Sequence, residues 1–158
     1  MTRPIPEGYN TITVSLAVKN ASDAIEFYKK AFGAQELSRF LMPDEKTIMH
    51  AQIKIGNSIL MLADEMPNMG CLSPQTLGGT AMSLFMYVED ADKTFAQAVA
   101  AGAQPLMPMM DAFWGDRFGS IQDPFGHIWG IATHKHDLAP EQIKKAGLEL
   151  FKHVQKPA

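Results

Sequence analysis

The chain has 158 residues, of which 46% are hydrophobic and 20% charged, so its composition is that of one globular domain and not of a disordered segment. Its formal net charge of −3, from 14 basic and 17 acidic residues, is small and of the wrong sign for a nucleic-acid-binding protein. The single cysteine, Cys71, excludes an intramolecular disulfide and a multi-cysteine metal site.

The first half of the chain begins with an alternating strand over residues 11–18, which ends next to a helix cap at Asn20. The helix that follows places four apolar residues on one face and stops at Gly33, and the face consists of Ala24, Phe27, Tyr28 and Ala31. Three strands are predicted next, over residues 36–41, 47–55 and 58–63. Residues 64–80 are rich in Pro, Gly and Met, which is typical of a linker or a mobile flap.

The second half repeats this order, because Val88 matches Val18 at an offset of 70 and both helices close on Gly-Ala-Gln. A strand over residues 82–88 leads to a cap at Asp90 and a helix that stops at Gly102. Strands follow over residues 105–113, 117–122 and 127–134, and the turn from Asp123 to Gly126 has the composition of a type I turn. The sequence therefore predicts two βαβββ modules, over residues 8–63 and 81–134.

A last helix is predicted over residues 139–155, with Pro140 in its first turn and a continuous apolar stripe. The predicted fold class is α+β in a single domain. Two mainly antiparallel four-stranded sheets face each other and leave a cup-like cavity, a typical place for a small ligand.

Two segments carry a resemblance to a known family: the strand-to-helix entry from Val18 to Gly33, and the stretch from Trp114 to His134 with its Asp-Pro-Phe-Gly-His hairpin. With the paired βαβββ modules, they resemble the vicinal oxygen chelate superfamily, and more narrowly its glyoxalase/bleomycin-resistance-like branch. That superfamily includes glyoxalase I, extradiol dioxygenases and fosfomycin-resistance enzymes. The resemblance covers about residues 8–137.

The resemblance also implies where a divalent metal would bind, since family enzymes hold it with His or Glu on the first and last strands of each module. Counting along the repeat places Thr13, Ser83, Leu60 and Gly130 at these four positions. None is a usual ligand for a divalent metal. We therefore expect no metal cofactor, and the alternative is a metal at a displaced site.

Several residues are candidates for contacting a ligand inside the cup. Strand alternation points Thr13, Ser15, Phe85 and Tyr87 inward, although core packing would give the same pattern. His50 shares a strand face with Gln52 and Lys54 and is the candidate general base; the alternative is a strand-surface histidine without a chemical role.

A second group surrounds a strand connection. Trp114 and Arg117 could clamp a planar or anionic ligand, or, with Asp116, they could stabilise a hairpin. His134 and His136, next to Asp137, are interpreted as structural because no further metal ligand is evident nearby.

Two functions remain open. The first is a binding protein of the bleomycin-resistance type for a small organic molecule. The second is an enzyme, either a lyase, isomerase or dioxygenase with a displaced metal or a metal-free one with His50 as base. We further expect a homodimer, because of the apolar last helix and the resemblance, and a cytoplasmic location without nucleic-acid or membrane partners.

Overall fold

The structure is a computed structural model that describes residues 2–152. The first module contains β1 (Ser15–Val18), α1 (Ala21–Phe32), β2 (Gln35–Leu41), β3 (Ile48–Ile55) and β4 (Ser58–Asp64). The second contains β5 (Ser83–Tyr87), α3 (Ala91–Ala101), β6 (Gln104–Asp111), β7 (Asp116–Gln122) and β8 (Ile128–His134). Two short helices, η1 (Pro67–Met69) and α2 (Pro74–Leu77), lie between the modules, and α4 (Pro140–Phe151) follows them.

Each module folds into one four-stranded mixed sheet, and the two sheets have the same topology. The strand orders are β1-β4-β3-β2 and β5-β8-β7-β6, with the first and last strand of each module paired in parallel and the other pairs antiparallel. The predicted α+β class with tandem βαβββ modules is confirmed. The first strand is shorter than predicted, since β1 begins at Ser15 and not at residue 11.

The helix ends follow the local sequence. Side chains of Asn20 and Asp90 accept hydrogen bonds from the third residue of α1 and α3, as predicted for N-caps. Gly33 ends α1 in the left-handed region, with φ of 66°. The inward face of α1 is fully buried against its own sheet and against the second module, so burial of this stripe holds the first module together.

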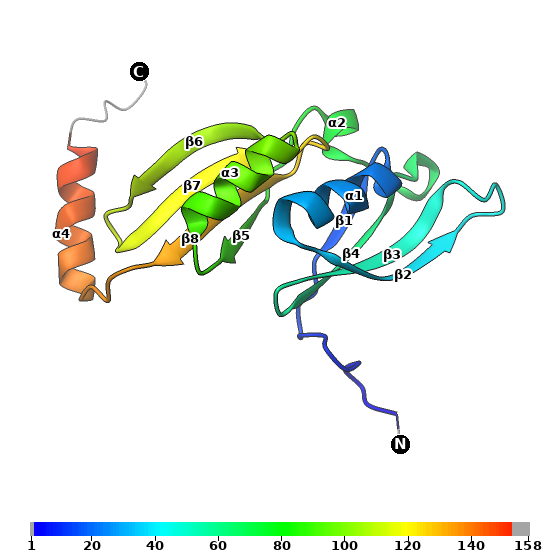
Figure 1. The fold of residues 1–158 in the computed structure, drawn as a ribbon, viewed down its shortest axis with the longest axis horizontal. Coiled ribbons are helices and arrows are strands. Elements are labelled where there is room, and N and C mark those ends of the chain that lie inside the picture. Colours follow the sequence, from blue (N-terminus) through cyan, green and yellow to red (C-terminus); the bar gives the residue numbers. More distant parts are fainter. Residues whose placement is uncertain (1, 153–158) are drawn as a thin grey trace.

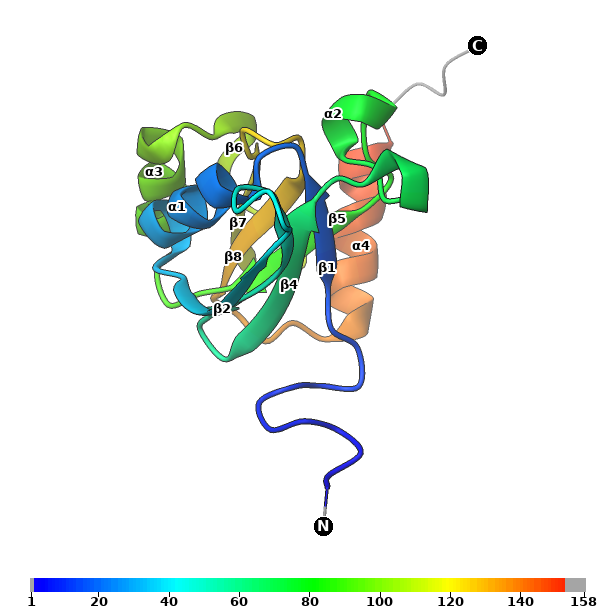
Figure 2. The same ribbon diagram turned by 90° about the vertical axis from the view of Figure 1, so that its right-hand side faces the viewer.

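The two helices lie side by side on one side of the molecule, and the sheets lie behind them (Figure 1). The view along the long axis shows α1 and α3 together at one side of both sheets (Figure 2). Each sheet therefore has a helix-covered face and a face turned away from the helices, which we call its open face.

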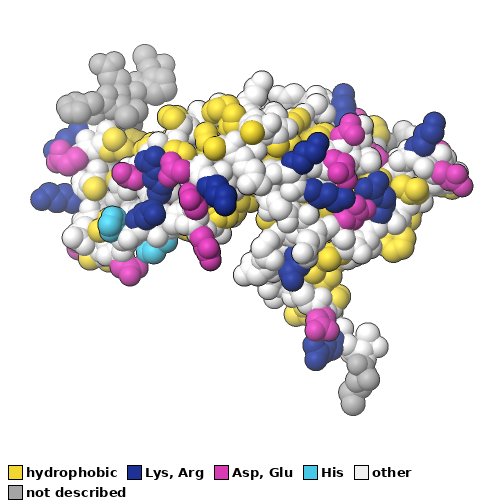
Figure 3. Space-filling view, in the orientation of Figure 1, with side chains coloured by type: hydrophobic (Ala, Val, Ile, Leu, Met, Phe, Trp, Pro, Cys, Tyr) yellow, Lys and Arg dark blue, Asp and Glu magenta, His cyan; other side chains and the backbone are white. Residues whose placement is uncertain are grey.

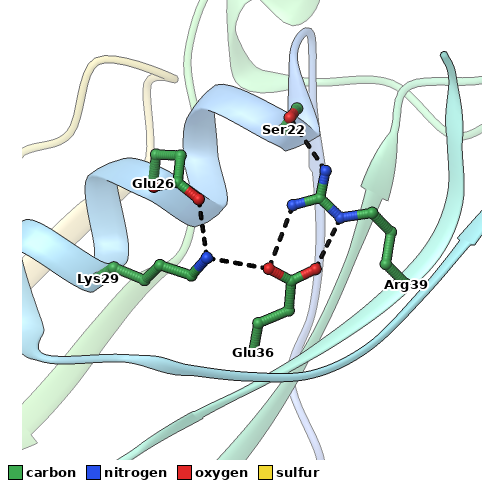
Figure 4. Close-up of polar contacts among 5 residues, drawn as sticks. All are labelled: Ser22, Glu26, Lys29, Glu36 and Arg39. Carbon is green, nitrogen blue, oxygen red and sulfur yellow. Dashed lines mark hydrogen bonds and ion pairs between the residues drawn. The ribbon is translucent and has the colours of Figure 1, made fainter.

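An ion-pair network fastens the edge strand β2 to α1 (Figure 4). Both carboxylate oxygens of Glu36 are bound by Arg39, at 2.7 and 3.2 Å, and Lys29 of α1 adds a contact of 3.0 Å. Arg39 also donates to the hydroxyl of Ser22 at 3.1 Å. These contacts are only partly screened by solvent, because about a quarter of the Glu36 side chain is exposed.

The segment between the modules, predicted as a linker or flap, is folded around Glu65. Its carboxylate accepts hydrogen bonds from the backbone N–H of Ser73 at 2.9 Å and from the hydroxyl of Thr76 at 2.7 Å. The side chain of Ser73, followed by its backbone N–H and by the Thr76 hydroxyl, lowers the pKa of Glu65 to about 2. Ser73 is fully buried and caps α2.

The last helix packs on the second module through Gly147, where the Phe113 ring lies 3.0 Å from the position that a Cβ atom would take. Leu150 and Phe151 of its apolar stripe are each more than half exposed, and so is Leu148 beside the stripe. Residues 153–155 of the predicted helix lie outside the described residues. Among the residues described, no helix is long and apolar enough to span a membrane.

Candidate functional site

The open face of the second sheet carries exposed aromatic side chains. Strand alternation buries Leu84 under α3 and turns Phe85 and Tyr87 to the other face. Phe85 is 49% exposed and Tyr87 is 63% exposed, values that are high for large side chains in a central part of the fold. Phe85 and Tyr87 thus share one face, as the alternation predicts, and this face is the open face of the second sheet.

Four rings form a continuous surface, which we call the aromatic cluster; its members are Phe85, Tyr87, Trp114 and Phe118. The Phe85 and Phe118 rings stack at 5.5 Å with an interplanar angle of 4°. Tyr87 lies 5.2 Å from Phe85, and Trp114 lies 5.4 Å from Phe118. Separations of this size are favourable for aromatic pairs.

Gly130 of β8 makes this stacking possible. A Cβ atom at this position would lie 2.7 Å from the Phe85 ring and 3.1 Å from the Phe118 ring. The two rings thus occupy the space that a side chain at position 130 would need. The position that the family resemblance assigns to a metal ligand is covered by aromatic rings.

Next to the cluster, three side chains donate hydrogen bonds to the buried carboxylate of Asp116, and we call these four residues the Asp116 network. Oδ2 accepts from the Tyr87 hydroxyl at 2.9 Å and from Trp114 Nε1 at 2.7 Å. Oδ1 lies 2.7 Å from Nδ1 of His134, which is the register partner of Asp116 across β7 and β8. The side chain of Asp116 is only 1% exposed.

The network shifts the pKa values of its members. Burial pushes the pKa of Asp116 upward, but the hydrogen bonds from His134, Tyr87 and Trp114 outweigh burial, so the pKa lies below its ordinary value. The pKa of His134 is raised by its hydrogen bonds to Asp137 and to Asp116. The pKa of Tyr87 is raised first by its hydrogen bond to Asp116. The arrangement therefore favours a carboxylate beside an imidazolium.

Arg117 is not part of this group. Because successive residues of β7 face opposite sides, Arg117 points to the helix-covered face. There it binds Asp92 of α3 at 2.9 Å and Asp111 at 3.4 Å. The hypothesis that Trp114 and Arg117 clamp one ligand is therefore wrong, and the supposed pairing of Asp116 with Arg117 is replaced by these two ion pairs.

The remaining candidates belong to the first module. Ser15 is exposed on the open face of β1, whereas Thr13 precedes that strand and donates to the carbonyl of Asn10 at 3.3 Å. His50 is half-buried on β3, stacks on Phe40 at 6.3 Å and lies 3.3 Å from the Gln52 amide. Ser15 and His50 share the open face of the first sheet, and in the described part of the chain none of the three residues forms a hydrogen bond with the Asp116 network.

One of the four supposed metal positions needs correction. Leu60 is buried on the helix-covered face, and Met61 is the register partner of Ser15 on the open face. In the second module the equivalent pair is Phe85 and Gly130, so the offset in this strand is 69 and not 70. The turns differ, since β3 and β4 are joined by two residues and β7 and β8 by five.

With Met61 in place of Leu60, these four positions still lack a ligand for a divalent metal, because a methionine thioether is a poor ligand for hard divalent cations. Throughout residues 2–152, no group of three or more His, Cys, Asp or Glu side chains is placed to hold a metal ion. The residues present at the family positions do not fit a divalent metal.

Two cavities adjoin the aromatic cluster. One of about 720 Å³ lies between the modules, where the surface in Figure 3 is hollowed, and is lined by Phe85, Tyr87, Ile59, Phe32 and Trp129. A second, more open depression of about 820 Å³ is lined by Tyr87 and His134 together with Lys93. Tyr87 lines both, and the first volume lies in the range of small-molecule sites.

The sequence offered Phe85, Tyr87 and Trp114 as candidate ligand contacts and gave His134 a structural interpretation. It did not indicate that His134 contacts Asp116, because Asp116 is 18 positions away and is adjacent only through the β7–β8 register. A signal was available: Asp116 directly precedes the predicted strand 117–122 and His134 ends the predicted strand 127–134, so both lie at the same end of that hairpin.

Comparison with known proteins agrees with this fold. The model of the Glyoxalase/Bleomycin resistance protein/Dioxygenase superfamily matches residues 10–131. The uncharacterized protein Rv0887c of Mycobacterium tuberculosis is 40% identical over 134 residues, which cover 83% of this chain and 78% of that protein. TioX from Micromonospora sp. ML1 superposes with a TM-score of 0.61 at 27% identity, covering 82% of this chain and 100% of that chain. The Arabidopsis thaliana At5g48480 product gives a TM-score of 0.63 at 26% identity, covering 78% and 98%.

Proposed function

Since the chain belongs to the Glyoxalase/Bleomycin resistance protein/Dioxygenase superfamily, we propose that it binds a small, planar and partly apolar organic molecule on the open face of its second sheet. We propose further that it does so without the divalent metal of the family enzymes. The observation that carries this proposal is the stack of Phe85 and Phe118 over Gly130, at the position that the resemblance gives to a metal ligand.

The exposed aromatic surface supports binding for an energetic reason. Burial of a large exposed ring against a ligand removes apolar surface from water, at about 25 cal/mol per Å². Ring pairs in stacked or edge geometry add about 0.5–1.5 kcal/mol. The cavity of about 720 Å³ between the modules reaches this surface at Phe85 and Tyr87, and the rest of its lining includes residues of the two helices, such as Phe32 and Thr94. The polar atoms of the Asp116 network at one end of the cluster then orient the ligand, because a small number of precisely placed polar groups fixes the orientation of a ligand in most small-molecule sites.

A second copy of the chain is part of the proposal. The open face of the first sheet and the neighbouring strand ends expose Phe40, Leu41 and Met49, and α4 exposes Leu150 and Phe151. Large apolar surfaces of this kind commonly belong to interfaces. We expect a cytoplasmic homodimer, and light scattering at micromolar concentration would return twice the chain mass of 17.4 kDa. A result at the single-chain mass would contradict the dimer.

The binding test uses the environment-sensitive dye anilinonaphthalene sulfonate and displacement by planar organic compounds. Phe85→Ala should weaken binding of the dye about tenfold, the effect of losing one well-packed aromatic contact. Leu77→Ala, which truncates a residue of α2 that is 64% exposed, is the matched control and should bind normally. Equal affinity of the Phe85 variant, or one tightly held Ni, Zn, Mn or Fe per chain by elemental analysis, would contradict the proposal.

A metal-free enzyme with His50 as base is the second candidate function. It is favoured by the half-buried position of His50 on the open face of β3, where Phe40 packs on the ring and Gln52 lies 3.3 Å from Nε2. A general base must lie within hydrogen-bonding distance of the proton that it removes, and the open face of β3 is accessible to a bound molecule. Loss of turnover in His50→Ala, with unchanged affinity for the ligand, would support this candidate. Unchanged turnover would remove it.

A further inference from the structure

His134 lies between two carboxylates that differ in burial. Its Nδ1 is 2.7 Å from Oδ1 of Asp116, and its Nε2 is 2.9 Å from Oδ1 of Asp137. The Asp116 side chain is 1% exposed and is held by Tyr87 and Trp114 as well. The Asp137 side chain is fully exposed and belongs to the segment that follows β8. The inner contact is fixed by the fold, and the outer one is not.

The outer contact is weak for a physical reason. An exposed ion pair between residues three positions apart contributes little to stability, since water and salt screen the attraction and both side chains lose freedom. Another oxygen anion at the same place would make an equivalent hydrogen bond to Nε2. Displacing the Asp137 carboxylate from Nε2 of His134 therefore costs little free energy. Displacing the buried Asp116 would leave the buried hydrogen-bonding groups of the network without a partner.

The inner carboxylate also sets the orientation of the ring. With Nδ1–H donated to Asp116, Nε2 of His134 points away from the network and towards solvent. Tyr87 connects this donor to the aromatic cluster, because its hydroxyl binds Asp116 and its ring lies 5.2 Å from that of Phe85. A donor for an anion and a surface for a planar ring thus lie on one sheet face.

We infer that the ligand is a planar organic acid, whose carboxylate or other oxyanion accepts a hydrogen bond from Nε2 of His134 in place of Asp137 while its ring lies on the aromatic cluster. This inference rests on the proposed binding function and names the ligand class for the same face. It assigns His134 to recognition of the ligand, a role that the sequence pattern alone did not indicate.

Other charged groups surround His134 in the depression that it shares with Tyr87. Lys93 adds a positive charge there, and Glu89 and Asp90 add negative ones. One oxygen of Asp90 accepts the backbone N–H of Lys93 at the start of α3. These three neighbours sum to one negative charge, so selection of an acid depends on the directed hydrogen bond from His134 and not on attraction by a positive field.

The pH dependence follows from the sign of the shift. Hydrogen bonds to Asp137 and Asp116 raise the pKa of His134, so the imidazolium persists above the ordinary range of histidine. An acid that accepts a hydrogen bond from Nε2 should bind tightly at a pH below this raised pKa. Its affinity should fall as the pH rises through the pKa. A neutral ligand of the same shape should show no such loss.

The test compares 2-naphthoate with 2-naphthamide by calorimetric titration of the full chain. These probes have the same ring and nearly the same shape, and only one carries a charge. At about pH 6, naphthoate should bind about tenfold more tightly, the effect of one charge-assisted hydrogen bond. At about pH 9 the advantage should be lost.

Two variants assign the effect to His134. His134→Gln should bring the two affinities together, while His136→Gln, two residues further on and exposed, should retain the preference. Asp137→Asn removes the competing carboxylate without touching the buried network. At about pH 6 it should therefore raise the affinity for naphthoate. This surface variant decides the question even if the His134 variant does not fold.

The outcomes separate the two proposals. Equal affinities for both probes in the unmodified protein, or an unchanged preference in His134→Gln, would overturn the acid inference and leave the binding function standing. Absence of binding for both probes, together with a Phe85→Ala variant that binds the dye normally, would overturn the proposed function and the acid inference with it.

Discussion

The hydroxyl of Tyr28 donates a hydrogen bond of 2.7 Å to Oδ2 of Asp123, 95 positions further along the chain. Tyr28 belongs to α1 of the first module, and Asp123 begins the last hairpin of the second. Both are buried, and Asp123 also accepts from Trp129 Nε1 at 2.9 Å. Burial first, and the neighbouring carboxylate second, raise the pKa of Tyr28. This bond joins the two modules inside their shared core.

Tyr28→Phe should therefore destabilise the protein by about 1.5–3 kcal/mol, the effect of losing a hydrogen bond to a buried charged group. For a chain of this size, each kcal/mol lowers the melting temperature by about 2–4 °C. Chemical denaturation followed by circular dichroism measures the free energy of unfolding. Tyr9→Phe is the control, because the Tyr9 hydroxyl is buried without a hydrogen-bond partner among the described residues. Equal destabilisation by both variants would contradict this role of Tyr28.

The pKa of His134 provides a second prediction. NMR titration of the imidazole signals should place its pKa above the ordinary range, and both Asp137→Asn and Asp116→Asn should lower it, since each removes a hydrogen-bonding carboxylate. If neither substitution moved the pKa of His134, the network would not exist in solution as described.

These shifts also fix how network stability depends on pH. The pKa of Asp116 is lowered by folding, so its contribution is present above the ordinary pKa of an aspartate and is lost as the pH falls through the lowered value. The pKa of His134 is raised, so its contribution is present below the ordinary histidine pKa and is lost as the pH rises through the raised value. Stability of this face should be greatest between the two limits.

Gly130 provides a third prediction. Gly130→Ala places a methyl group about where the Phe85 and Phe118 rings now lie, and should cost about 1–3 kcal/mol through overpacking. It should also weaken dye binding, since the stacked rings must move apart. The double variant Gly130→Ala with Phe85→Leu creates room and should recover part of the stability but not the binding. No gain in unfolding free energy for the double variant would contradict the steric explanation.

The network at the edge strand of the first module provides a fourth. Glu36→Gln breaks the ion pairs with Arg39 and Lys29 and should cost about 1 kcal/mol at neutral pH. Glu26→Gln, which removes one contact of a more exposed residue, should cost less. Because the hydrogen bond from Arg39 is the largest of the effects that lower the pKa of Glu36, the difference between wild type and Glu36→Gln should shrink as the pH falls through that lowered value. A cost that does not change with pH would contradict this assignment.

The sequence by itself determined the eight strands, the three long helices and their order. Helix caps at Asn20 and Asp90, the glycine stop at Gly33 and the turn from Asp123 are short-range features, and each is seen where predicted. The repeat then implied two like modules, and alternation assigned Phe85 and Tyr87 to the open face. Apart from the repeat, which compares segments 70 positions apart, these features depend on residues only a few positions apart.

Tertiary structure alone decided which side chains meet. The Asp116–His134 pair depends on the β7–β8 register, and the partners of Arg117 come from α3 and β6. The finding that Met61, and not Leu60, lies on the open face shows the reason. A hairpin turn of different length moves the register by one residue, and a shift of one residue moves a side chain to the opposite face of a sheet. Register between strands is a property of the folded sheet, so the composition of the site was set by contacts that no local pattern contains.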